Sequence, residues 1–570
     1  MQLPTMTNKS STIHPGIEAA RTVPSLTQRQ QWLGGLIVAF ALALRLLWLG
    51  IKPPHFDEGV NGWFVDQITK QGYFAYDPTN YHGPFHFYVL FLVQSLFGRN
   101  IEALRMPLIL INTANVWLLL QFRRFLPWRA CVFAALAFAV SPGMLFYSRY
   151  AIHESWVVFG MTLGLWGAAE LWTRGTARGL WAAAGGILLM LLNKETHLLH
   201  FAAFGLALAA LAALERIFPS ANEGVPPLPA ARQWSWKTLL DTTAGCLFLL
   251  AFFFSGGFLN PAPRGELIAH FFSAFAAWSH TGLHSADHAK PWYYWLQLFA
   301  RYEWPVVVGL LWSLRALWPG MNRLARFLAI YGCGALAGYS LVPYKTPWCV
   351  ISVIWPFLLL FGCAVDSGIG FLQKRGSRPP VAWLPGAAAL ALWGLSLAAA
   401  VNLNYRHPTE PGEAELPAWA TQRLSPRLQT VCSLPTYVYV QTTNDYFKLT
   451  RPLKTLLLLD RRARHMPVHI LLSSYHPLPW ALGELTHVGY YDKGLPPLMD
   501  GGIIVAEENR TAEVEALLKE AYFVEPFQLR DAMDGGKLYL NAARFAPVFP
   551  GRAPEFTPRA GASPLPSPAP

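Results

Sequence analysis

Long apolar runs fill most of the chain between residues 33 and 402, and they constrain its fold more than any other feature. A membrane-spanning helix needs roughly 20 apolar residues, and shorter helices occur in polytopic bundles. Charged residues make up only 14% of the chain, against about 25% in soluble domains. The sequence therefore predicts a mainly α, polytopic membrane bundle of about 11 transmembrane helices. The candidate spans are residues 33–51, 105–122, 128–146, 156–173, 180–193, 198–214, 238–258, 304–318, 326–343, 348–365 and 383–402.

Basic residues between the runs predict the orientation of the bundle, because cytoplasmic loops are enriched in Lys and Arg. If the N-terminal segment, residues 1–32, is cytoplasmic, every basic cluster falls on the cytoplasmic side. This arrangement requires that the run 84–98 does not cross. The run is short and carries His86 and Gln94, which favours an interfacial helix within the first outer loop. The clusters are Arg123 with Arg124 and Arg129, Arg174 with Arg178, Arg323 with Arg326, and Lys374 with Arg375 and Arg378.

Eleven crossings from a cytoplasmic N-terminus place several segments and the C-terminal region on the outer face. The short segments are 148–155, 193–197 and 342–348, together with the longer stretch 259–303. After the transmembrane domain (33–402), residues 403–548 predict a small outer α/β domain, because short β-branched and aromatic runs return there. The expected elements are strands at 436–443, 468–474, 502–508 and 537–545, and a helix at 511–521 that starts near Asn509 to Thr511. The Pro-rich tail, 549–570, is expected to be disordered.

Composition excludes several classes of protein. The net charge is +12, but the basic residues are dispersed between apolar runs, so nucleic-acid binding is not expected. Five of the six cysteines lie in apolar runs, which leaves no disulfide framework. No paired Cys/His spacing typical of a metal site occurs, although His280, His284 and His288 follow at i, i+4 and i+8. Gly282 and a nearby proline weaken a helical arrangement of these histidines. Solvated loop histidines, or histidines of an acceptor groove, are therefore favoured over a metal site.

The candidate chemistry lies in the outer segments. Asp57 and Glu58 follow the first span and precede an aromatic, histidine-bearing loop. As a bare pair they are typical of solvated loop acids, and the context favours the wall of a site. Lys345 opposes the positive-inside bias, and its counter-charge is either a nearby carboxylate or a phosphate. Transfer of a sugar from a lipid phosphate needs a base for the acceptor hydroxyl and cations for the departing phosphate. Asp57 could be that base, and Lys345, Arg149 and Lys194 those cations.

Several motifs together resemble the GT-C superfamily of integral membrane glycosyltransferases. "HFDEG" and "YHGPFHFYVLFLVQSLFG" look like its first loop and interfacial helix, "EALRMPLILINTANVWLLLQFRR" like its second span, and "SPGMLFYSRYAIHES" like its third span and second loop. "LLNKETH", "KPWYYWLQLFARYEWP" and "LVPYKTPW" resemble the prokaryotic flippase-activity-associated subgroup. The resemblance implies a hexosyl or pentosyl transferase of the inner cell membrane. It would use a polyprenyl-phosphate-linked sugar, invert the anomeric carbon and act at the outer leaflet.

The resemblance also implies roles for individual residues. Asp57 would be the catalytic base, and Glu58 would assist it or orient the acceptor. Glu154 would match a second-loop acid that is usually Asp and that binds metal in oligosaccharyltransferases. The sequence requires no cofactor, and a divalent cation remains possible. The expected substrate-binding residues are Arg149, Glu154, Lys345, Tyr344, His82, His55 and Lys194.

Two other interpretations of the sequence remain open. A non-catalytic partner or transporter of lipid-linked sugars would handle the same lipid without transferring the sugar. Such a protein should carry acids or broken helices near the bilayer midplane, whereas the acids here cluster near one surface. The outer domain could also be a carbohydrate- or protein-binding module that selects the acceptor, whether that acceptor is a glycan, a lipid or a protein.

Overall fold

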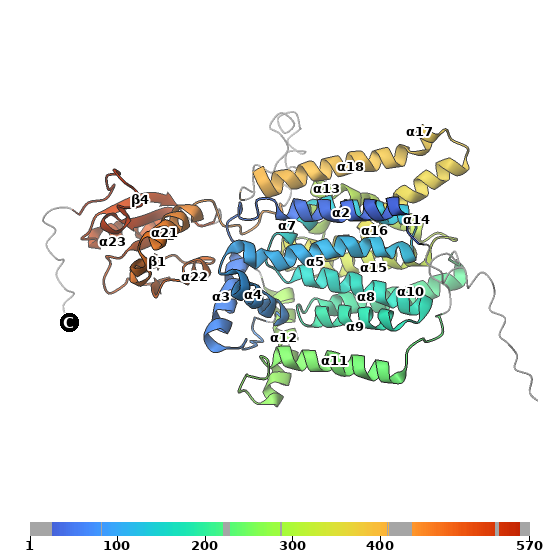
Figure 1. Ribbon diagram of the computed structural model, residues 1–570, viewed down its shortest axis with the longest axis horizontal. Coiled ribbons are helices and arrows are strands. Elements are labelled where there is room, and N and C mark those ends of the chain that lie inside the picture. The colour runs from blue at the N-terminus through green and yellow to red at the C-terminus, as the bar shows by residue number, and fades with distance from the viewer. Residues whose placement is uncertain are drawn as a thin grey trace, which may run out of the picture.

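The computed structural model describes residues 25–80, 82–220, 229–285, 288–406, 409, 436–530 and 535–558. A bundle of long helices fills most of it, and a small domain lies beyond one end (Figure 1). We call this end of the bundle the domain end. The bundle helices are α2 (Gln28–Leu46), α5 (Ile101–Gln121), α6 (Trp128–Val140), α7 (Pro142–Ser148), α8 (Glu154–Arg174), α9 (Ala177–Leu191), α10 (His197–Ile217), α11 (Trp236–Phe254), α14 (Trp304–Ala316), α15 (Arg323–Leu341), α16 (Val350–Lys374) and α18 (Leu384–Val401).

Each of the expected spans falls on one of these helices, and the span expected at 128–146 is the pair α6 and α7, bent by 57°. In the described part of the chain, six helices are long and apolar enough to cross a membrane, or seven if the bent pair counts as one span. Helices α9 and α14 are apolar but shorter. Short helices of this kind are supported by packing against neighbouring helices. The chain is therefore a multi-pass membrane protein, as its apolar runs predict.

The basic clusters gather at the end of the bundle opposite the small domain. Arg124, Arg174 and Arg178 all pair with Glu170. Arg129 on α6 pairs with Asp366 on the neighbouring helix α16. The N-terminus of α2 lies at this same end (Figure 1). An odd number of crossings therefore separates the start of α2 from the small domain.

Four further helices lie between or beside the spans: α3 (Phe56–Gln71), α4 (Phe85–Phe97), α12 (Arg264–His284) and α13 (Tyr294–Tyr302). Helix α4 occupies the place of the expected interfacial helix and packs on α3 through Phe87 and Phe64. Helix α3 was not expected, because its sequence contains no long apolar run. Asp57 and Glu58 are therefore in the first turn of a helix and not in an open loop.

Helices α8 and α9 form a close hairpin that brings residue 154 beside residue 194. A Cβ atom at Gly167 would lie 2.3 Å from the main-chain nitrogen of Ala183, and one at Gly186 would lie 2.5 Å from the carbonyl oxygen of Gly160. Small residues at such positions allow membrane helices to approach closely. The start of α8 and the residues after α9 meet at the domain end.

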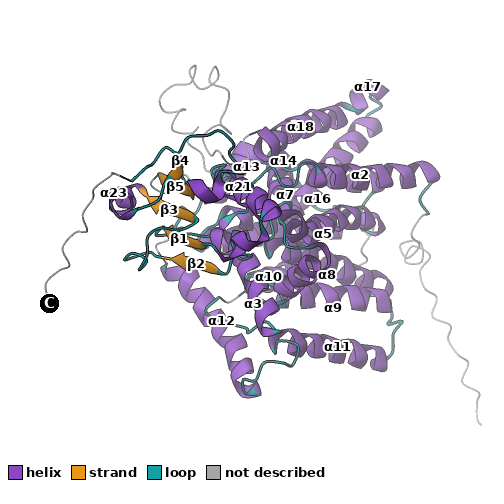
Figure 2. Cartoon of the chain, turned by 60° about the vertical axis from the view of Figure 1, so that its left-hand side comes forward, coloured by secondary structure: helices purple, strands orange, loops and turns teal. Residues whose placement is uncertain are grey.

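The small domain is an α/β domain with one five-stranded sheet (Figure 2). The strand order is β2-β1-β3-β5-β4, in which β1 is parallel to β2 and β3, and β5 is antiparallel to β3 and β4. Its elements are α21 (Tyr446–Leu459), β1 (Pro467–Leu471), α22 (Leu478–Ala481), β2 (His487–Tyr490), β3 (Ile503–Glu507), α23 (Glu508–Leu517), β4 (Tyr522–Phe527), β5 (Gly536–Asn541) and α24 (Ala542–Phe545).

The expected strands at 468–474, 502–508 and 537–545 correspond to β1, β3 and β5, and the last run ends as a short helix. The expected helix at 511–521 corresponds to α23, which begins and ends a few residues earlier. Strands β2 and β4 and helix α21 were not expected.

The expected strand at 436–443 is wrong. This segment, which we call the strap, crosses the domain end of the bundle. Tyr437 stacks on Tyr302 with ring centroids 4.6 Å apart, and its carbonyl oxygen accepts a hydrogen bond from the Tyr147 hydroxyl at 3.0 Å. Val440 has a φ of 53°, which a β-branched residue adopts rarely and an extended strand does not allow. The aromatic residues of the strap are buried against the bundle and not in the sheet.

The tail expected to be disordered is ordered through residue 558. Phe556 exchanges two main-chain hydrogen bonds of 3.0 Å with Tyr522 on β4, and Arg552 pairs with Glu525 and Glu555. Residues 559–570 of the tail and 1–24 of the N-terminal segment lie outside the described residues.

Candidate active site

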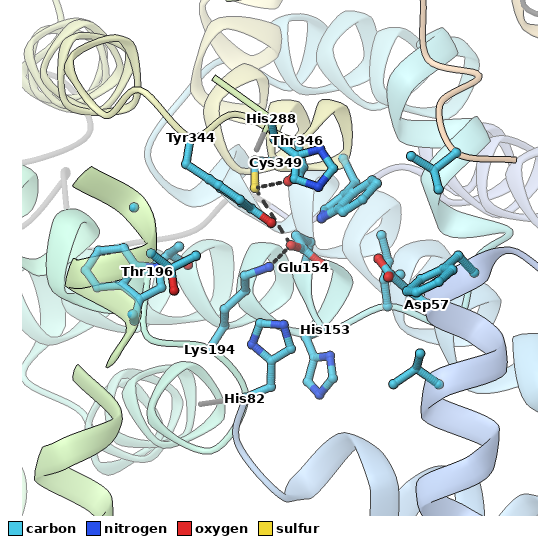
Figure 3. A pocket seen from close by; sticks show the side chains of 18 of the residues that line it. Asp57, His82, His153, Glu154, Lys194, Thr196, His288, Tyr344, Thr346 and Cys349 are labelled. Carbon is cyan, nitrogen blue, oxygen red and sulfur yellow. Dashed lines mark hydrogen bonds and ion pairs between the residues drawn. The ribbon is translucent and has the colours of Figure 1, made fainter. Parts of the chain in front are cut away.

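A cavity of about 560 Å³ lies at the domain end, between the bundle and the α/β domain (Figure 3). Its walls come from the start of α3, the segments on either side of α8 and α9, the end of α12, the break between α15 and α16, the strap and the domain. Six predicted site residues line it: His55, Asp57, His82, Glu154, Lys194 and Tyr344.

Three predicted site residues do not line this cavity: Glu58, Arg149 and Lys345. Asp57 and Glu154 line one cavity, whereas the two expected cations Arg149 and Lys345 do not. All three of the excluded side chains are buried elsewhere.

Asp57 is held at the start of α3 by the residue that caps this helix. The main-chain N–H of Asp57 donates to His55 Nδ1 at 3.1 Å, and His55 Nε2 lies 2.9 Å from the carbonyl oxygen of Tyr439 in the strap. His55 is therefore the tautomer that carries its proton on Nε2. The positive end of the helix dipole favours a carboxylate at this position. Within the described residues no cation pairs with the Asp57 carboxylate.

Glu58 points away from the cavity and pairs with Arg105 on α5. Its Oε2 and Oε1 accept hydrogen bonds from Arg105 Nη2 at 2.6 Å and Nε at 2.8 Å. Oε1 also accepts from the main-chain N–H of Ala151 at 2.9 Å, and Oε2 from that of His55 at 2.9 Å. Burial alone would raise the pKa of Glu58, but Arg105 and these hydrogen bonds hold it below its ordinary value. Glu58 therefore joins α3 to the segment before α8 and to α5.

Glu154 and Lys194 form an ion pair in the cavity wall (Figure 3). Burial would lower the pKa of Lys194, but the neighbouring Glu154 carboxylate raises it above its ordinary value. Lys194 is therefore charged at neutral pH. The picture shows this pair on one side of the cavity and Asp57 on the other. In the described parts of the chain, no three His, Cys, Asp or Glu side chains are arranged to hold a metal ion.

His82 faces the same cavity from the segment between α3 and α4. Its Nδ1 lies 3.3 Å from Glu195 Oε2, and its ring centroid lies 4.8 Å from that of His153. Burial and then the charge of Lys194 lower the pKa of His82 to about 3, so its ring is neutral at pH 7. A neutral imidazole can accept a hydrogen bond from a sugar hydroxyl or donate one to it.

Arg149 and Lys345 bind the main chain. Arg149 donates to the carbonyl oxygens of Arg45 at 3.0 Å, Leu47 at 2.6 Å and Trp48 at 3.0 Å. It thereby satisfies the free carbonyl groups at the end of α2.

Lys345 donates to the carbonyl oxygens of Lys290, at 3.2 Å, and Val342. Among the described residues, the Lys345 ammonium is bound by these carbonyl dipoles and not by a carboxylate. A Lys or Arg at a helix end caps carbonyl groups as readily as it binds a ligand, and the sequence does not separate these two roles.

Sequence reasoning missed the part of the cavity that the α/β domain supplies. Arg530 and Ser474 of the domain and Val440 of the strap line the cavity, as do Thr346 and Cys349 in the break before α16. No local pattern marks these residues, because the tertiary fold alone brings them to the cavity.

The histidines considered as metal ligands separate in the structure. His280 and His284 stack on α12 with ring centroids 5.2 Å apart. His288 lies beyond the end of α12, where Nδ1 bonds the hydroxyl of Tyr439. The expectation of loop histidines is therefore wrong for His280 and His284, which are helical, and His288 lies in a cavity wall.

No protein-family model and no curated protein sequence matches the chain. Among solved structures it resembles ArnT from Cupriavidus metallidurans bound to undecaprenyl phosphate. That match has a TM-score of 0.56 at 17% identity and covers 90% of this chain and 99% of ArnT. The apo form of ArnT gives a TM-score of 0.55 at 17% identity, covering 91% and 99%. An oligosaccharyltransferase from Archaeoglobus fulgidus gives 0.46 at 11% identity, covering 90% and 74%. The likeness to ArnT confirms the expected GT-C fold: a polytopic helical bundle with a small C-terminal domain.

Proposed function

We propose that this chain is a membrane glycosyltransferase that moves a sugar from a polyprenyl-phosphate carrier to an acceptor hydroxyl. The fold it shares with ArnT supports glycosyl transfer in general, and ArnT has been crystallised with undecaprenyl phosphate. The cavity volume of about 560 Å³ falls in the usual range for small-molecule sites, about 300–1,000 Å³. The sugar and the acceptor stay unspecified in this proposal.

One observation carries the proposal: Asp57 lies in the first turn of α3, faces the cavity, and lies across from the Lys194–Glu154 pair. A carboxylate opposite a cation is the minimum that transfer from a lipid phosphate requires. The carboxylate accepts a proton, and the cation stabilises the charge that grows on the leaving phosphate.

In the proposed reaction, Asp57 takes the proton of the acceptor hydroxyl as its oxygen attacks the anomeric carbon. The bond between that carbon and the phosphate oxygen breaks, and its electron pair leaves with the carrier phosphate. A single displacement of this kind inverts the anomeric centre. Lys194 stabilises the departing phosphate. His82, in the segment between α3 and α4, forms a hydrogen bond with a hydroxyl of the sugar. The reaction as proposed needs no metal ion.

The proposed location is the inner cell membrane, with the N-terminus in the cytoplasm and the α/β domain on the outer face. The basic clusters gather at the end opposite the domain, where the positive-inside bias places the cytoplasm. Asp57, Lys194 and the acceptor would then meet at the outer surface of the bilayer.

Asp57→Asn tests the proposal, with Asp77→Asn as the matched control. Asp77 is an exposed acid in the segment between α3 and α4 and does not line the cavity. In cells that carry only the variant gene, glycan structures are compared by mass spectrometry, together with the lipid-linked sugars that co-purify with the protein. We expect Asp57→Asn to reduce transfer by about 100-fold or more while the sugar-charged lipid still co-purifies.

Asp77→Asn should behave as wild type. Unchanged glycans with Asp57→Asn, accompanied by reduced lipid export, would instead indicate a transporter or a non-catalytic partner.

A further inference from the structure

We propose that Arg530 of the α/β domain binds a phosphate group of a substrate in the cavity, beside Asp57. This inference rests on the proposed glycosyl transfer and adds a second anion-binding position, supplied by the outer domain. The α/β domain then contributes a substrate-binding residue to the cavity.

The first argument is position. Arg530 lines the cavity together with Ser474 and Val440. Its guanidinium carbon lies 5.0 Å from the centroid of the Phe56 ring, and Phe56 directly precedes Asp57. The domain therefore places a cation next to the first turn of α3, where the proposed base lies.

The second argument is rigidity. Arg530 is only 6% exposed, and its Nη1 and Nη2 donate to the carbonyl oxygens of His476 and Ser474, each at 3.3 Å. Its main chain pairs with Thr442 of the strap, and the Thr442 hydroxyl donates to the carbonyl oxygen of Pro54 at 2.6 Å. The guanidinium is thus held in place before substrate arrives, which reduces the entropy lost on binding.

The third argument is charge. Among the described residues that line the cavity, Lys194 and Arg530 are the two with permanent cationic side chains. Lys194 belongs to the bundle wall and pairs with Glu154. Arg530 adds a second positive charge from the domain wall. The oxygens of a phosphate match the planar fork of an arginine, and their negative charge complements it.

A phosphate in this cavity has two sources. It can be the phosphate of the lipid carrier, shared between Lys194 and Arg530. It can also be a phosphate on the acceptor, bound by Arg530 alone while Lys194 holds the carrier.

The test uses the full-length protein in lipid nanodiscs and undecaprenyl phosphate as the probe, with binding measured by native mass spectrometry. The variants are Arg530→Gln, Arg530→Lys and, as control, Arg461→Gln. Arg461 is exposed on the same domain and does not line the cavity. Transfer is measured in parallel from cellular glycans, and folding from the melting temperature.

We expect Arg530→Gln to weaken phosphate recognition by about 10-fold or more, with partial recovery in Arg530→Lys and no change in Arg461→Gln. Weaker binding of undecaprenyl phosphate identifies the carrier phosphate. Unchanged binding of this lipid with reduced transfer, partly restored by Arg530→Lys, identifies a phosphate on the acceptor.

Wild-type binding and wild-type transfer in Arg530→Gln would overturn the inference. If that variant does not fold, the same binding and transfer measurements on Arg530→Lys test the inference. This variant keeps the positive charge but replaces the planar guanidinium with an ammonium group. The binding of undecaprenyl phosphate is measured without turnover. If Asp57→Asn did not reduce transfer, the proposed function would fail, and the binding measurement would still test the role of Arg530.

Discussion

The carboxylate of Glu58 and the guanidinium of Arg105 form a two-point ion pair, with oxygen–nitrogen distances of 2.6 and 2.8 Å, and neither side chain has exposed surface. Asp57, one residue earlier, lines the cavity. Successive residues on a helix point about 100° apart, so adjacent acids at the start of α3 serve different purposes. Asp57 lines the cavity, and Glu58 fixes the helix that carries it.

Glu58→Gln should destabilise the protein strongly. The substitution leaves the buried Arg105 charge without a counter-ion, and breaking a buried pair in this way costs about 3–5 kcal/mol. The melting temperature of the purified protein measures the effect, and Glu513→Gln, at an exposed position on α23, is the control. Equal melting temperatures in the two variants would contradict the structural role given to Glu58.

The stability that Glu58 contributes should depend on pH in a defined direction. Its pKa in the folded protein lies below the ordinary 4.5, so its contribution is complete above pH 4.5 and is lost as the pH falls through the folded pKa. The gap in melting temperature between wild type and Glu58→Gln should be constant near neutral pH and should narrow in acid. A difference in melting temperature that grows as the pH falls would contradict the lowered pKa of Glu58.

Lys194→Gln should weaken binding of a lipid phosphate. Lys194 is the bundle's cation in the cavity and stays charged because Glu154 raises its pKa. We expect the affinity for undecaprenyl phosphate to fall by about 10-fold or more. Lys237→Gln is the control, since Lys237 is exposed on α11 and pairs with Asp241 away from the cavity. The same loss in both variants would show a general membrane effect and not a site.

Gly59→Ala should separate the α/β domain from α3. A Cβ atom at this position would lie 2.4 Å from the Cα atom of Pro477, whereas Gly205 on α10 has open space around it. We expect Gly59→Ala to accelerate proteolytic cleavage between bundle and domain and to reduce transfer, while Gly205→Ala changes neither. Unchanged cleavage would mean that the two surfaces can move apart without loss.

The sequence predicts the bundle well because apolar length and charge placement are local properties. Every expected span lies on a helix, and the run 84–98 forms α4 beside α3. Helix α3 escaped prediction because its few core-packing apolar residues, Phe64, Val65 and Ile68, form no long apolar run. Its cap and the buried contacts of Glu58 stabilise it as well. The strap was mistaken for a strand because aromatic and β-branched residues favour burial in either setting.

The candidate site was predictable in part, for a related reason. Asp57, Glu154 and Lys194 all line the cavity. They were predictable because each lies in an outer segment next to an apolar run of the sequence. Charge alone did not distinguish Arg149, which caps α2, from Arg530, which lines the cavity. That distinction depends on where distant segments meet in space.

The strap and the domain also order events during biogenesis. Domains emerge from the ribosome in sequence, N-terminal parts first, and the wall formed by Val440, Ser474 and Arg530 comes after the last helix of the bundle. A nascent chain that has inserted all its membrane helices still has an incomplete cavity. Under the proposed function, transfer begins only after this last segment has folded against the bundle and completed the cavity wall beside Asp57.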